Sequence, residues 1–482
     1  MLMPEFFANP QNFTDHIKNE GHKQYYLSTI NAYLQSLLDL DTLYRLQALP
    51  SHLNENNCSQ ASAPINLEGN QLVALTLVKD MIREREQFNE SYGQIAMCPS
   101  DVDWRRFLLI LGKAGTGKTF TMQQLIQYCL DNMLSVAVAV PTGTLACTYR
   151  ERYQELVTCD TLHGFFNFSS DNNNGSRINW NIAMYDIIFI DEISQVSVEM
   201  FHHIISTVDK VIRRPLVVMC GDFAQQQPIS TVNNETRQVS NISSCQHCLS
   251  FLVRVTLTTQ HRTDDTHLVS FLQHIRFFKP TDEMLSTIMD GRILLPNRII
   301  DSSLYEKLRQ HPEATILTMT KRAAMYINEI IITSAFSSSP ICVVLMDDES
   351  LIPVHKSTRL IITQNINKQI GFVNGQFINV VAVRNNTIIA CTSSGAILNI
   401  HPITKKVDDR EITVYPCLPG YANTICKAQG QTLNKVVLWI DTERTPPGTA
   451  YVAFSRVKRL SDLYFLTELF PQQFTPVTQE TI

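Results

Sequence analysis

The segment from residue 112 to residue 119 matches the complete Walker A pattern. An apolar run, 107–111, precedes it, and a helix-permissive stretch, 120–130, follows it. A strand, a glycine-rich turn and a helix in this order place backbone N–H groups and a helix N-terminus around a polyphosphate. These flanks argue against a chance match in a flexible loop. The predicted nucleoside triphosphate site comprises Gly112, Lys113, Ala114, Gly115, Thr116, Gly117, Lys118 and Thr119.

Two residues of this segment have specific predicted tasks. Lys118 would place a positive charge on the β- and γ-phosphates, and Thr119 would offer a hydroxyl to Mg²⁺. An acidic pair fits the same chemistry, because the apolar run 187–190 is followed by Asp191 and Glu192. This is the Walker B arrangement, in which Asp191 would hold Mg²⁺ and Glu192 would polarise the attacking water.

Composition sets the limits of the remaining interpretation. With 482 residues, the chain exceeds one hydrophobic core, and two or three domains are expected. A net charge of −5 excludes a polybasic protein, but a local groove of Lys and Arg remains compatible with nucleic acid. The sequence has neither an apolar run of membrane-spanning length nor a signal-peptide pattern at residue 1. We therefore expect an intracellular, soluble protein of the nucleus or cytoplasm.

The 12 cysteines are scattered, and several fall in apolar runs, which is typical of reduced, buried thiols. Cys245-Gln-His-Cys248 raises the hypothesis of a zinc site. A structural site needs four ligands, and no second Cys/His pair lies nearby in sequence. The pattern therefore favours a plain loop.

Hydrophobic patterning predicts an α/β protein. Unbroken Val/Ile/Leu runs indicate strands buried on both faces of a parallel sheet. Between residues 341 and 414, alternation and turn signals instead predict a small antiparallel barrel or sheet. The predicted buried strands are 107–111, 135–140, 187–190 and 216–220 in one domain, and 315–318 and 436–440 in another.

This patterning gives a domain division. We expect an accessory helical region at 1–60, a first domain at 61–245 and a second domain at 246–482. An exposed hairpin is expected near 165–182 in the first domain, and the β insertion interrupts the second at about 341–415.

Three further side chains are candidates for contact with the γ-phosphate, one through an amide and two through a guanidinium group. Gln225 follows the third buried strand, where an amide can contact that phosphate, although a Gly-Asp turn with solvated glutamines is the simpler interpretation. Arg262 and Arg456 lie outside the Walker segments. A guanidinium that reaches across a cleft neutralises charge on a transferred phosphoryl group, whereas most arginines form surface salt bridges.

Other stretches carry hydroxyls, amides, aromatics and one Lys that suit contact with a nucleic-acid strand. Phenylalanine clusters such as the one around residue 165 are more often part of a core than a base-stacking surface. The candidates for nucleic-acid contact are Thr142, His163, Phe165, Lys427, Gln429 and Thr432.

Taken in order, these segments resemble superfamily 1B helicases of the RecD and petite-integration-frequency (PIF) type. The resemblance extends over about 400 residues. Two departures weaken individual assignments: Cys426 stands where the family usually has His, and the gap from Gln71 to Gly112 is long. The segments similar to motifs I, Ia, Ib, II, III, IV, V and VI are 112–119, 138–146, 161–166, 191–194, 221–225, 257–262, 421–432 and 451–456.

The resemblance implies a fold and specific roles. It implies two RecA-like domains, with an SH3-like subdomain at the β insertion and a wedge at the hairpin near Asn174. Gln71 would recognise adenine and Gln225 would sense the γ-phosphate. Arg262 and Arg456 would act as arginine fingers from the second domain.

The function implied is an ATP-dependent, Mg²⁺-requiring DNA helicase that moves 5′-to-3′ on single-stranded DNA. It would unwind forked DNA in replication, recombination or repair, as a monomer and alongside replication or recombination proteins. Two alternatives stay open, a superfamily 1 RNA helicase and a nucleotide-gated DNA clamp that does not unwind.

Overall fold

The computed structural model describes residues 67–477 except for several internal stretches. The predicted accessory region 1–60 and the tip of the predicted hairpin, including Asn174, lie outside the described residues. The stretches left out are 93–103, 169–178, 212–213, 233–234, 239, 241, 264, 312, 337–339, 347–349, 365, 367–371, 393–394 and 408–409.

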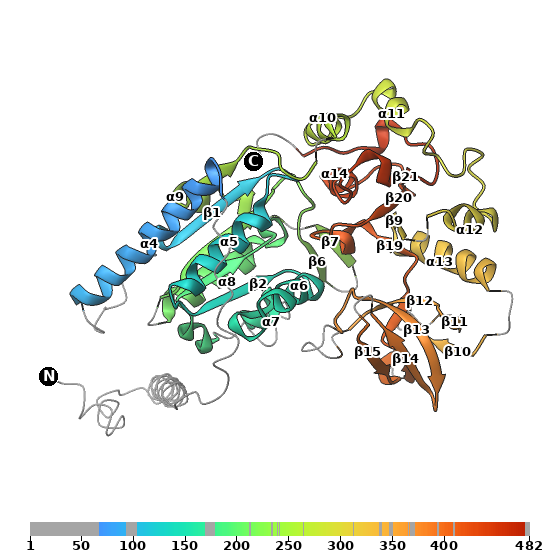
Figure 1. Ribbon diagram of the computed structural model, residues 1–482, viewed down its shortest axis with the longest axis horizontal. Helices are drawn as coiled ribbons and strands as arrows, with labels where there is room; N and C mark the ends of the chain where they lie inside the picture. The colour runs from blue at the N-terminus through green and yellow to red at the C-terminus, as the bar shows by residue number, and fades with distance from the viewer. Residues whose placement is uncertain are drawn as a thin grey trace.

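The chain forms two α/β lobes that lie side by side (Figure 1). The first lobe is built on a parallel six-stranded sheet with the order β3-β2-β4-β5-β1-β8. Every residue of β2, β4 and β5 is buried, which explains their unbroken apolar sequences. The strands are β1 (Phe107–Gly112), β2 (Val136–Val140), β3 (Thr158–Thr161), β4 (Ile187–Ile190), β5 (Leu216–Gly221) and β8 (Val253–Leu257).

Helices cover both faces of this sheet. One core packs α4 (Asn70–Tyr92), α5 (Lys118–Asp131) and α6 (Gly143–Tyr153) against the sheet. The opposite core contains α7 (Leu162–Phe165), α8 (Val198–Lys210) and α9 (Gln246–Phe251). Because β8 pairs with β1, the first sheet extends to Leu257. The predicted domain boundary at residue 245 is therefore too early.

The second lobe contains a smaller parallel sheet with the order β19-β9-β20-β21. The predicted α/β class with two parallel sheets is confirmed. The strands of this second sheet are β9 (Ala314–Thr318), β19 (Ala422–Thr424), β20 (Lys435–Trp439) and β21 (Leu463–Phe465). The helices of this lobe are α10 (Thr266–Ile275), α11 (Asp282–Met289), α12 (Ser303–Leu308), α13 (Lys321–Ala335) and α14 (Thr449–Phe454).

An antiparallel region lies between β9 and β19, where the sequence predicts a β insertion. Its main sheet has five strands in the order β15-β14-β13-β12-β18 around its own apolar core. The SH3-like identity of this region stays a prediction. Its strands are β10 (Cys342–Leu345), β11 (Leu351–Val354), β12 (Arg359–Ile362), β13 (Phe377–Arg384), β14 (Thr387–Cys391), β15 (Ile397–Ile400), β16 (Ile403–Val407), β17 (Arg410–Val414) and β18 (Cys417–Pro419).

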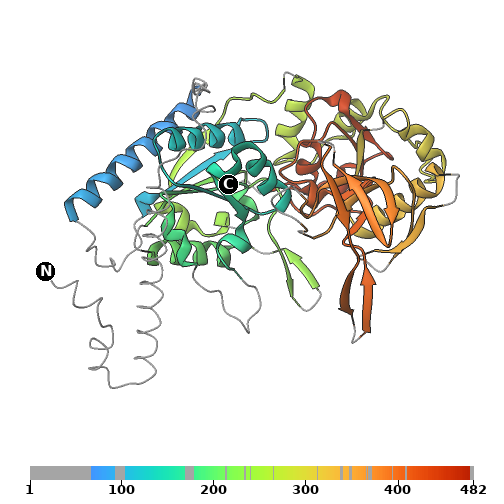
Figure 2. The ribbon, with the colours of Figure 1, turned by 60° about the horizontal axis from the view of Figure 1, so that its bottom comes forward.

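Two separate hairpins project from the same side of the molecule, one from each lobe (Figure 2). The first is formed by β6 (Ile229–Val232) and β7 (Glu235–Gln238), and the second by β16 and β17. Within the described residues, no helix combines the length and apolar character needed to cross a membrane.

Candidate nucleotide and nucleic-acid site

The Walker A loop lies where three strands of the first sheet end. Leu111 of β1 is in register with Gly221 of β5, and Gly112 is in register with Leu257 of β8. The loops that follow these parallel strands therefore meet at one edge of the sheet. This edge is the usual ligand-binding edge of an open α/β sheet.

Within the loop, the glycines allow close approach by other side chains. Gly115 and Gly117 have φ values of 88° and 79°, in the left-handed region that favours glycine. A Cβ atom on Gly117 would lie 2.6 Å from Nε2 of Gln71, and one on Gly115 would overlap the Gln260 amide. Any side chain at these positions would displace both amides.

Lys118 is the first residue of α5, and its ammonium group folds back over the loop. Its Nζ donates to the carbonyl oxygens of Gly112 at 2.9 Å and Lys113 at 3.0 Å. These contacts hold the positive charge above the space enclosed by the loop. A phosphate in that space would accept hydrogen bonds from the Lys118 ammonium group and from the backbone N–H groups of the loop.

The acidic pair follows β4 and lies within electrostatic reach of Lys118, with Asp191 buried and Glu192 partly buried. The Tyr149 hydroxyl donates to Oδ2 of Asp191 at 2.8 Å. Burial raises the pKa of Asp191, while the Tyr149 hydroxyl, Lys118 and the Thr119 hydroxyl act in the opposite direction. Asp191, Lys118 and Thr119 therefore converge, as the sequence predicts, and Tyr149 is an additional member that the motifs do not reveal.

Glu192 has a strained backbone, with a φ of 57°, and its side chain is partly buried. Its Oε2 atom is buried and makes no hydrogen bond within the described part of the protein. Burial and Asp191 raise the pKa of this carboxyl, and the charges of Lys118 and Arg456 lower it. A buried polar atom without a partner is unfavourable in a purely structural role, and it suits a group that binds a substrate water.

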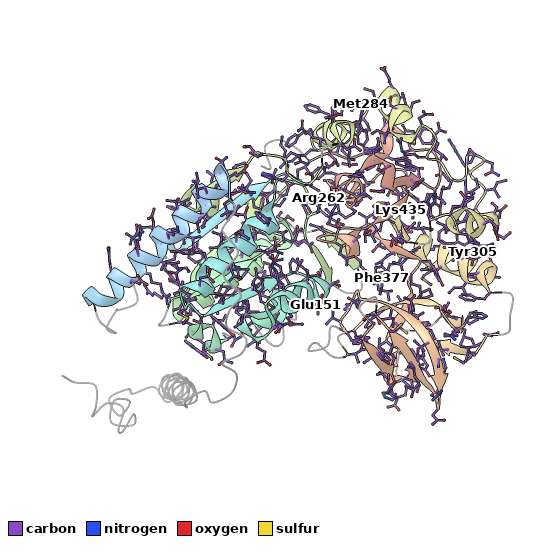
Figure 3. All side chains as sticks on the ribbon, in the orientation of Figure 1. Glu151, Arg262, Met284, Tyr305, Phe377 and Lys435 are labelled. Atoms are coloured by element: carbon purple, nitrogen blue, oxygen red, sulfur yellow. The ribbon has the colours of Figure 1, made fainter. Side chains whose placement is uncertain are left out.

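The two predicted arginines reach the same place from different elements. Arg262 lies between the lobes (Figure 3), and its backbone N–H donates to the Gly115 carbonyl at 3.1 Å. Its guanidinium donates to the Ser455 carbonyl at 2.7 Å and to the Thr432 hydroxyl at 2.9 Å. Arg262 thus follows directly from the first sheet and reaches into the second lobe, whereas the sequence prediction assigns it to the second domain.

Arg456 follows α14 of the second lobe and is 3% exposed. Its guanidinium donates to the carbonyl of Gln431 at 3.1 Å and to the Ser455 hydroxyl at 2.8 Å. Burial and the neighbouring Arg262 lower its pKa to about 10, while Glu192 acts in the opposite direction. Arg456 is therefore still protonated at neutral pH and lies within electrostatic reach of Glu192.

A chain of hydrogen bonds that the sequence does not reveal joins the two lobes at the Walker loop. The Ala114 N–H donates to the hydroxyl oxygen of Tyr451 at 2.7 Å, and this hydroxyl donates to Oδ2 of Asp222 at 3.0 Å. Arg276 forms a buried ion pair with the other oxygen of Asp222 at 2.7 Å. Tyr451 lies in α14 and Arg456 two residues after its end, so this helix and the turn that follows it position both the contact to the loop and the arginine.

The two predicted glutamines both lie close to this site. Gln71, at the start of α4, is 4% exposed, and its Nε2 donates to the Thr116 carbonyl at 3.4 Å. Gln71 thus lies beside the Walker loop despite the long sequence gap, and its recognition of adenine stays a prediction. Gln225 is buried after β5, and its Oε1 has no hydrogen-bond partner within the described residues.

The candidates for nucleic-acid contact in the first lobe separate into two groups. Thr142 caps α6 after β2, and His163 is exposed on α7 after β3, so both lie at the same sheet edge as the Walker loop. Phe165 is instead 5% exposed and packs against Phe166 and Tyr185 in the core. A base cannot stack on a ring that is already covered, so the prediction of a base contact by Phe165 is wrong.

The candidates in the second lobe also separate. Gln429 is buried, and its amide donates to the Ser194 hydroxyl at 3.4 Å, next to the acidic pair. The Thr432 hydroxyl accepts from Arg262. Both residues therefore lie on the nucleotide side of the site rather than on an open strand surface. Lys427 lines a cavity, Cys426 next to it is exposed, and the contact of Lys427 with nucleic acid stays a prediction.

This cavity, of about 580 Å³, separates α13 from the antiparallel region. Lys321 and Lys427 lie on its wall, and burial together with the charge of Lys321 lowers the pKa of Lys427. Close to it, the Thr144 hydroxyl of the first lobe donates to the Asn374 carbonyl at 2.7 Å. The cavity therefore opens near a contact between the lobes.

Comparison with known proteins agrees with this architecture. A family model described as an AAA domain matches residues 101–231. The chain is 25% identical over 389 residues to the ATP-dependent DNA helicase PIF1 of Xenopus laevis, covering 74% of this chain and 58% of the relative. The chain thus spans little more than half the length of that relative.

Solved structures show the same fold. A structure of two coordinating Pif1 helicases on forked double-stranded DNA has a TM-score of 0.60 at 20% identity, covering 86% of this chain and 95% of that chain. The Pif1 helicase from Bacteroides in complex with ADP-AlF3 and single-stranded DNA has a TM-score of 0.58 at 18% identity, covering 83% and 95% of the two chains. The chain therefore carries a match to an AAA domain at residues 101–231 and shares the fold of these Pif1 helicases.

Proposed function

We propose that this chain is an ATP-dependent DNA helicase that moves along single-stranded DNA and separates forked duplexes. The observation that supports this most directly is the joint construction of the nucleotide site. Ala114 of the Walker loop contacts Tyr451 of the second lobe, and the charge of Arg456, just after the same helix, acts on Glu192. A nucleotide bound here would touch both lobes, so its hydrolysis would change how they sit together.

In this proposal, Lys118 binds the β- and γ-phosphates and Gln71 lies against the base. Glu192 accepts a proton from water as the water oxygen attacks the γ-phosphorus and the bond to the β–γ bridging oxygen breaks. Arg262 and Arg456 stabilise the charge that develops on the transferred group. Thr119 and Asp191 supply oxygen ligands that fit Mg²⁺, which would neutralise phosphate charge when bound.

The DNA strand would run over the sheet edge that carries Thr142 and His163, and continue past Lys427 near the cavity. Lys321 and Lys427 provide positive charge for phosphates without reading the base sequence. The Pif1 helicase structures named above contain forked or single-stranded DNA. The 5′-to-3′ direction follows from the PIF-type resemblance.

A strand-displacement assay tests the proposal. Duplexes with a 5′ tail, a 3′ tail or a fork are mixed with the full chain, Mg²⁺ and ATP, and the released strand is measured. We expect release from the 5′-tailed and forked substrates and little from the 3′-tailed one. Matched RNA tails form a second arm, and preferential release on RNA would support an RNA helicase instead.

A separate ATPase measurement distinguishes a motor from a clamp. Single-stranded DNA should stimulate ATP hydrolysis in the same preparation. DNA binding that depends on nucleotide, without stimulated hydrolysis or strand release, would support a clamp and contradict the helicase proposal.

A further inference from the structure

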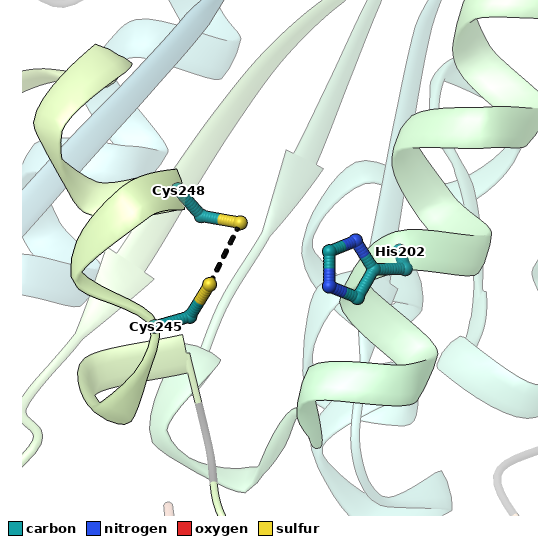
Figure 4. Close-up of side chains that lie close together, drawn as sticks. All are labelled: His202, Cys245 and Cys248. Atoms are coloured by element: carbon teal, nitrogen blue, oxygen red, sulfur yellow. Dashed lines mark hydrogen bonds between the residues drawn. The ribbon is translucent and has the colours of Figure 1, made fainter.

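We propose that His202, Cys245 and Cys248 bind a zinc ion that fastens the β7–β8 connection to α8. The three side chains come from two separate parts of the chain (Figure 4). Their ligand atoms all lie within 4.8 Å of one another. The sequence shows the Cys-x-x-Cys pair, but it does not show His202, which is brought to the pair by the fold.

The donor set suits zinc rather than a harder cation. Two thiolates and one imidazole are ligands that Zn²⁺ prefers, whereas Mg²⁺ and Ca²⁺ prefer oxygen. The two Sγ atoms lie 3.0 Å apart. With Zn–S bonds of about 2.3 Å in a tetrahedron, two sulfurs lie roughly 3.8 Å apart, so small side-chain rotations would admit the ion. The fourth position would be taken by a solvent molecule.

The surroundings match a site that is anchored on one side and open on the other. Cys248 is 2% exposed and belongs, with Leu249, to the core between the first sheet and α7, α8 and α9. His202 is exposed on α8. The buried thiol would fix the ion to the protein. The exposed imidazole would leave room for the solvent ligand.

The location gives the site a mechanical role. The Val198 N–H at the start of α8 donates to the Ser240 carbonyl, just after the β6–β7 hairpin, at 3.1 Å. His202 lies four residues after Val198, on the same face of α8. Zinc would add a second, stronger attachment at the base of the projecting hairpin. The attached segment leads through β8 to Arg262 at the nucleotide site.

An intramolecular disulfide between Cys245 and Cys248 is the competing use of the pair. It would employ the two sulfurs and leave His202 without a task. The convergence of the imidazole on the thiols therefore favours metal binding. The two uses differ in thiol content, in mass and in bound metal, so one preparation distinguishes them.

The test uses the full chain, purified under reducing conditions with any affinity tag removed. Elemental analysis by mass spectrometry should find about one zinc per chain. His202→Ala, Cys245→Ser and Cys248→Ser should each lose most of this zinc. His267→Ala and Cys391→Ser, which alter an exposed His on α10 and a free Cys in β14, should retain it.

Two readouts guard against a variant that simply misfolds. Cobalt added to the metal-free wild type should give the visible bands of a tetrahedral thiolate site, and His202→Ala, which changes an exposed residue, should lose them while keeping its circular dichroism spectrum. A chelator should lower the Tm of the wild type and leave that of His202→Ala unchanged. Wild-type protein without zinc, a Cys245–Cys248 disulfide in the reduced preparation, or equal zinc in all variants would overturn the proposal.

Discussion

Lys118 carries the positive charge of the Walker loop, and its contacts show what its removal would change. In the structure, its ammonium group is held by the Gly112 and Lys113 carbonyls rather than by a packed core. Lys118→Ala should therefore fold normally and lose ATP turnover by at least roughly a hundredfold, since a phosphate-directed charge is lost. Steady-state phosphate release checks this, with Lys458→Ala on an exposed residue as the control. Wild-type turnover in Lys118→Ala would contradict the phosphate assignment.

Glu192 permits a sharper test, because its proposed role separates binding from hydrolysis. Glu192→Gln keeps the shape of the side chain but removes the base, so ATP should still bind while hydrolysis falls by about 10²- to 10⁴-fold. Fluorescent-nucleotide titration and single-turnover hydrolysis measure the two steps separately. Glu151→Gln, at an exposed position on α6 of the same lobe, is the control (Figure 3). Loss of binding in Glu192→Gln, with hydrolysis reduced only in proportion, would argue against a base.

At the level of elements, α14 links the second lobe to the Walker loop through one hydroxyl. Tyr451→Phe removes the acceptor of the Ala114 N–H and a donor to Asp222, both in a buried place. An unsatisfied buried group costs about 1–3 kcal/mol, so the Tm should fall, and ATP hydrolysis should fall with it because the loop loses its support. Thermal melts and ATPase assays check this against Tyr326→Phe, whose hydroxyl lies at the surface. Unchanged hydrolysis would show that the contact does not support the loop.

At the level of elements, local sequence patterns predict some strands and site residues but not the contacts between distant segments. Apolar runs without alternation predict the interior strands of both parallel sheets, because residues buried on two faces leave a continuous signal. The edge strands β3, β8, β19 and β21 lack such long apolar runs and are not predicted. The Walker A residues could be predicted to lie together because they are consecutive and form one turn between β1 and α5. By contrast, Tyr149, Tyr451 and His202 act through contacts with distant segments, which no local pattern records.

Errors in the sequence predictions have the same origin. Phe165 has the right side chain for stacking on a base, but its orientation depends on how α7 packs against Tyr185. The amide of Gln429 faces Ser194, and the hydroxyl of Thr432 faces Arg262, because the second lobe packs closely on the first. Residue type indicates which chemistry is available, whereas tertiary packing decides which surface receives it.

At the level of the whole molecule, communication between nucleotide and strand requires that the lobes approach closely at the site. Gly448, directly before α14, is a point of such approach, with a φ of 75°. A Cβ atom there would lie 2.5 Å from the Ala224 carbonyl oxygen of the first lobe and 2.9 Å from that of Gln225. Backbone atoms cannot rotate away as a flexible side chain does. Gly448→Ala should therefore push the lobes apart rather than disturb either core.

The chain offers a matched control for this change. Gly291 also has a positive φ, of 67°, but a Cβ atom on it would meet nothing within 4 Å. Gly291→Ala and Gly448→Ala thus share the backbone cost of a left-handed alanine, roughly 1–2 kcal/mol, and differ in the contact between lobes. DNA-stimulated ATP hydrolysis should fall at least tenfold in Gly448→Ala and stay near wild type in Gly291→Ala. Small-angle X-ray scattering with an ATP analogue should show compaction in the control but not in Gly448→Ala. Equal loss of hydrolysis in both variants would place the effect in the backbone and remove the evidence for a closure that both lobes must share.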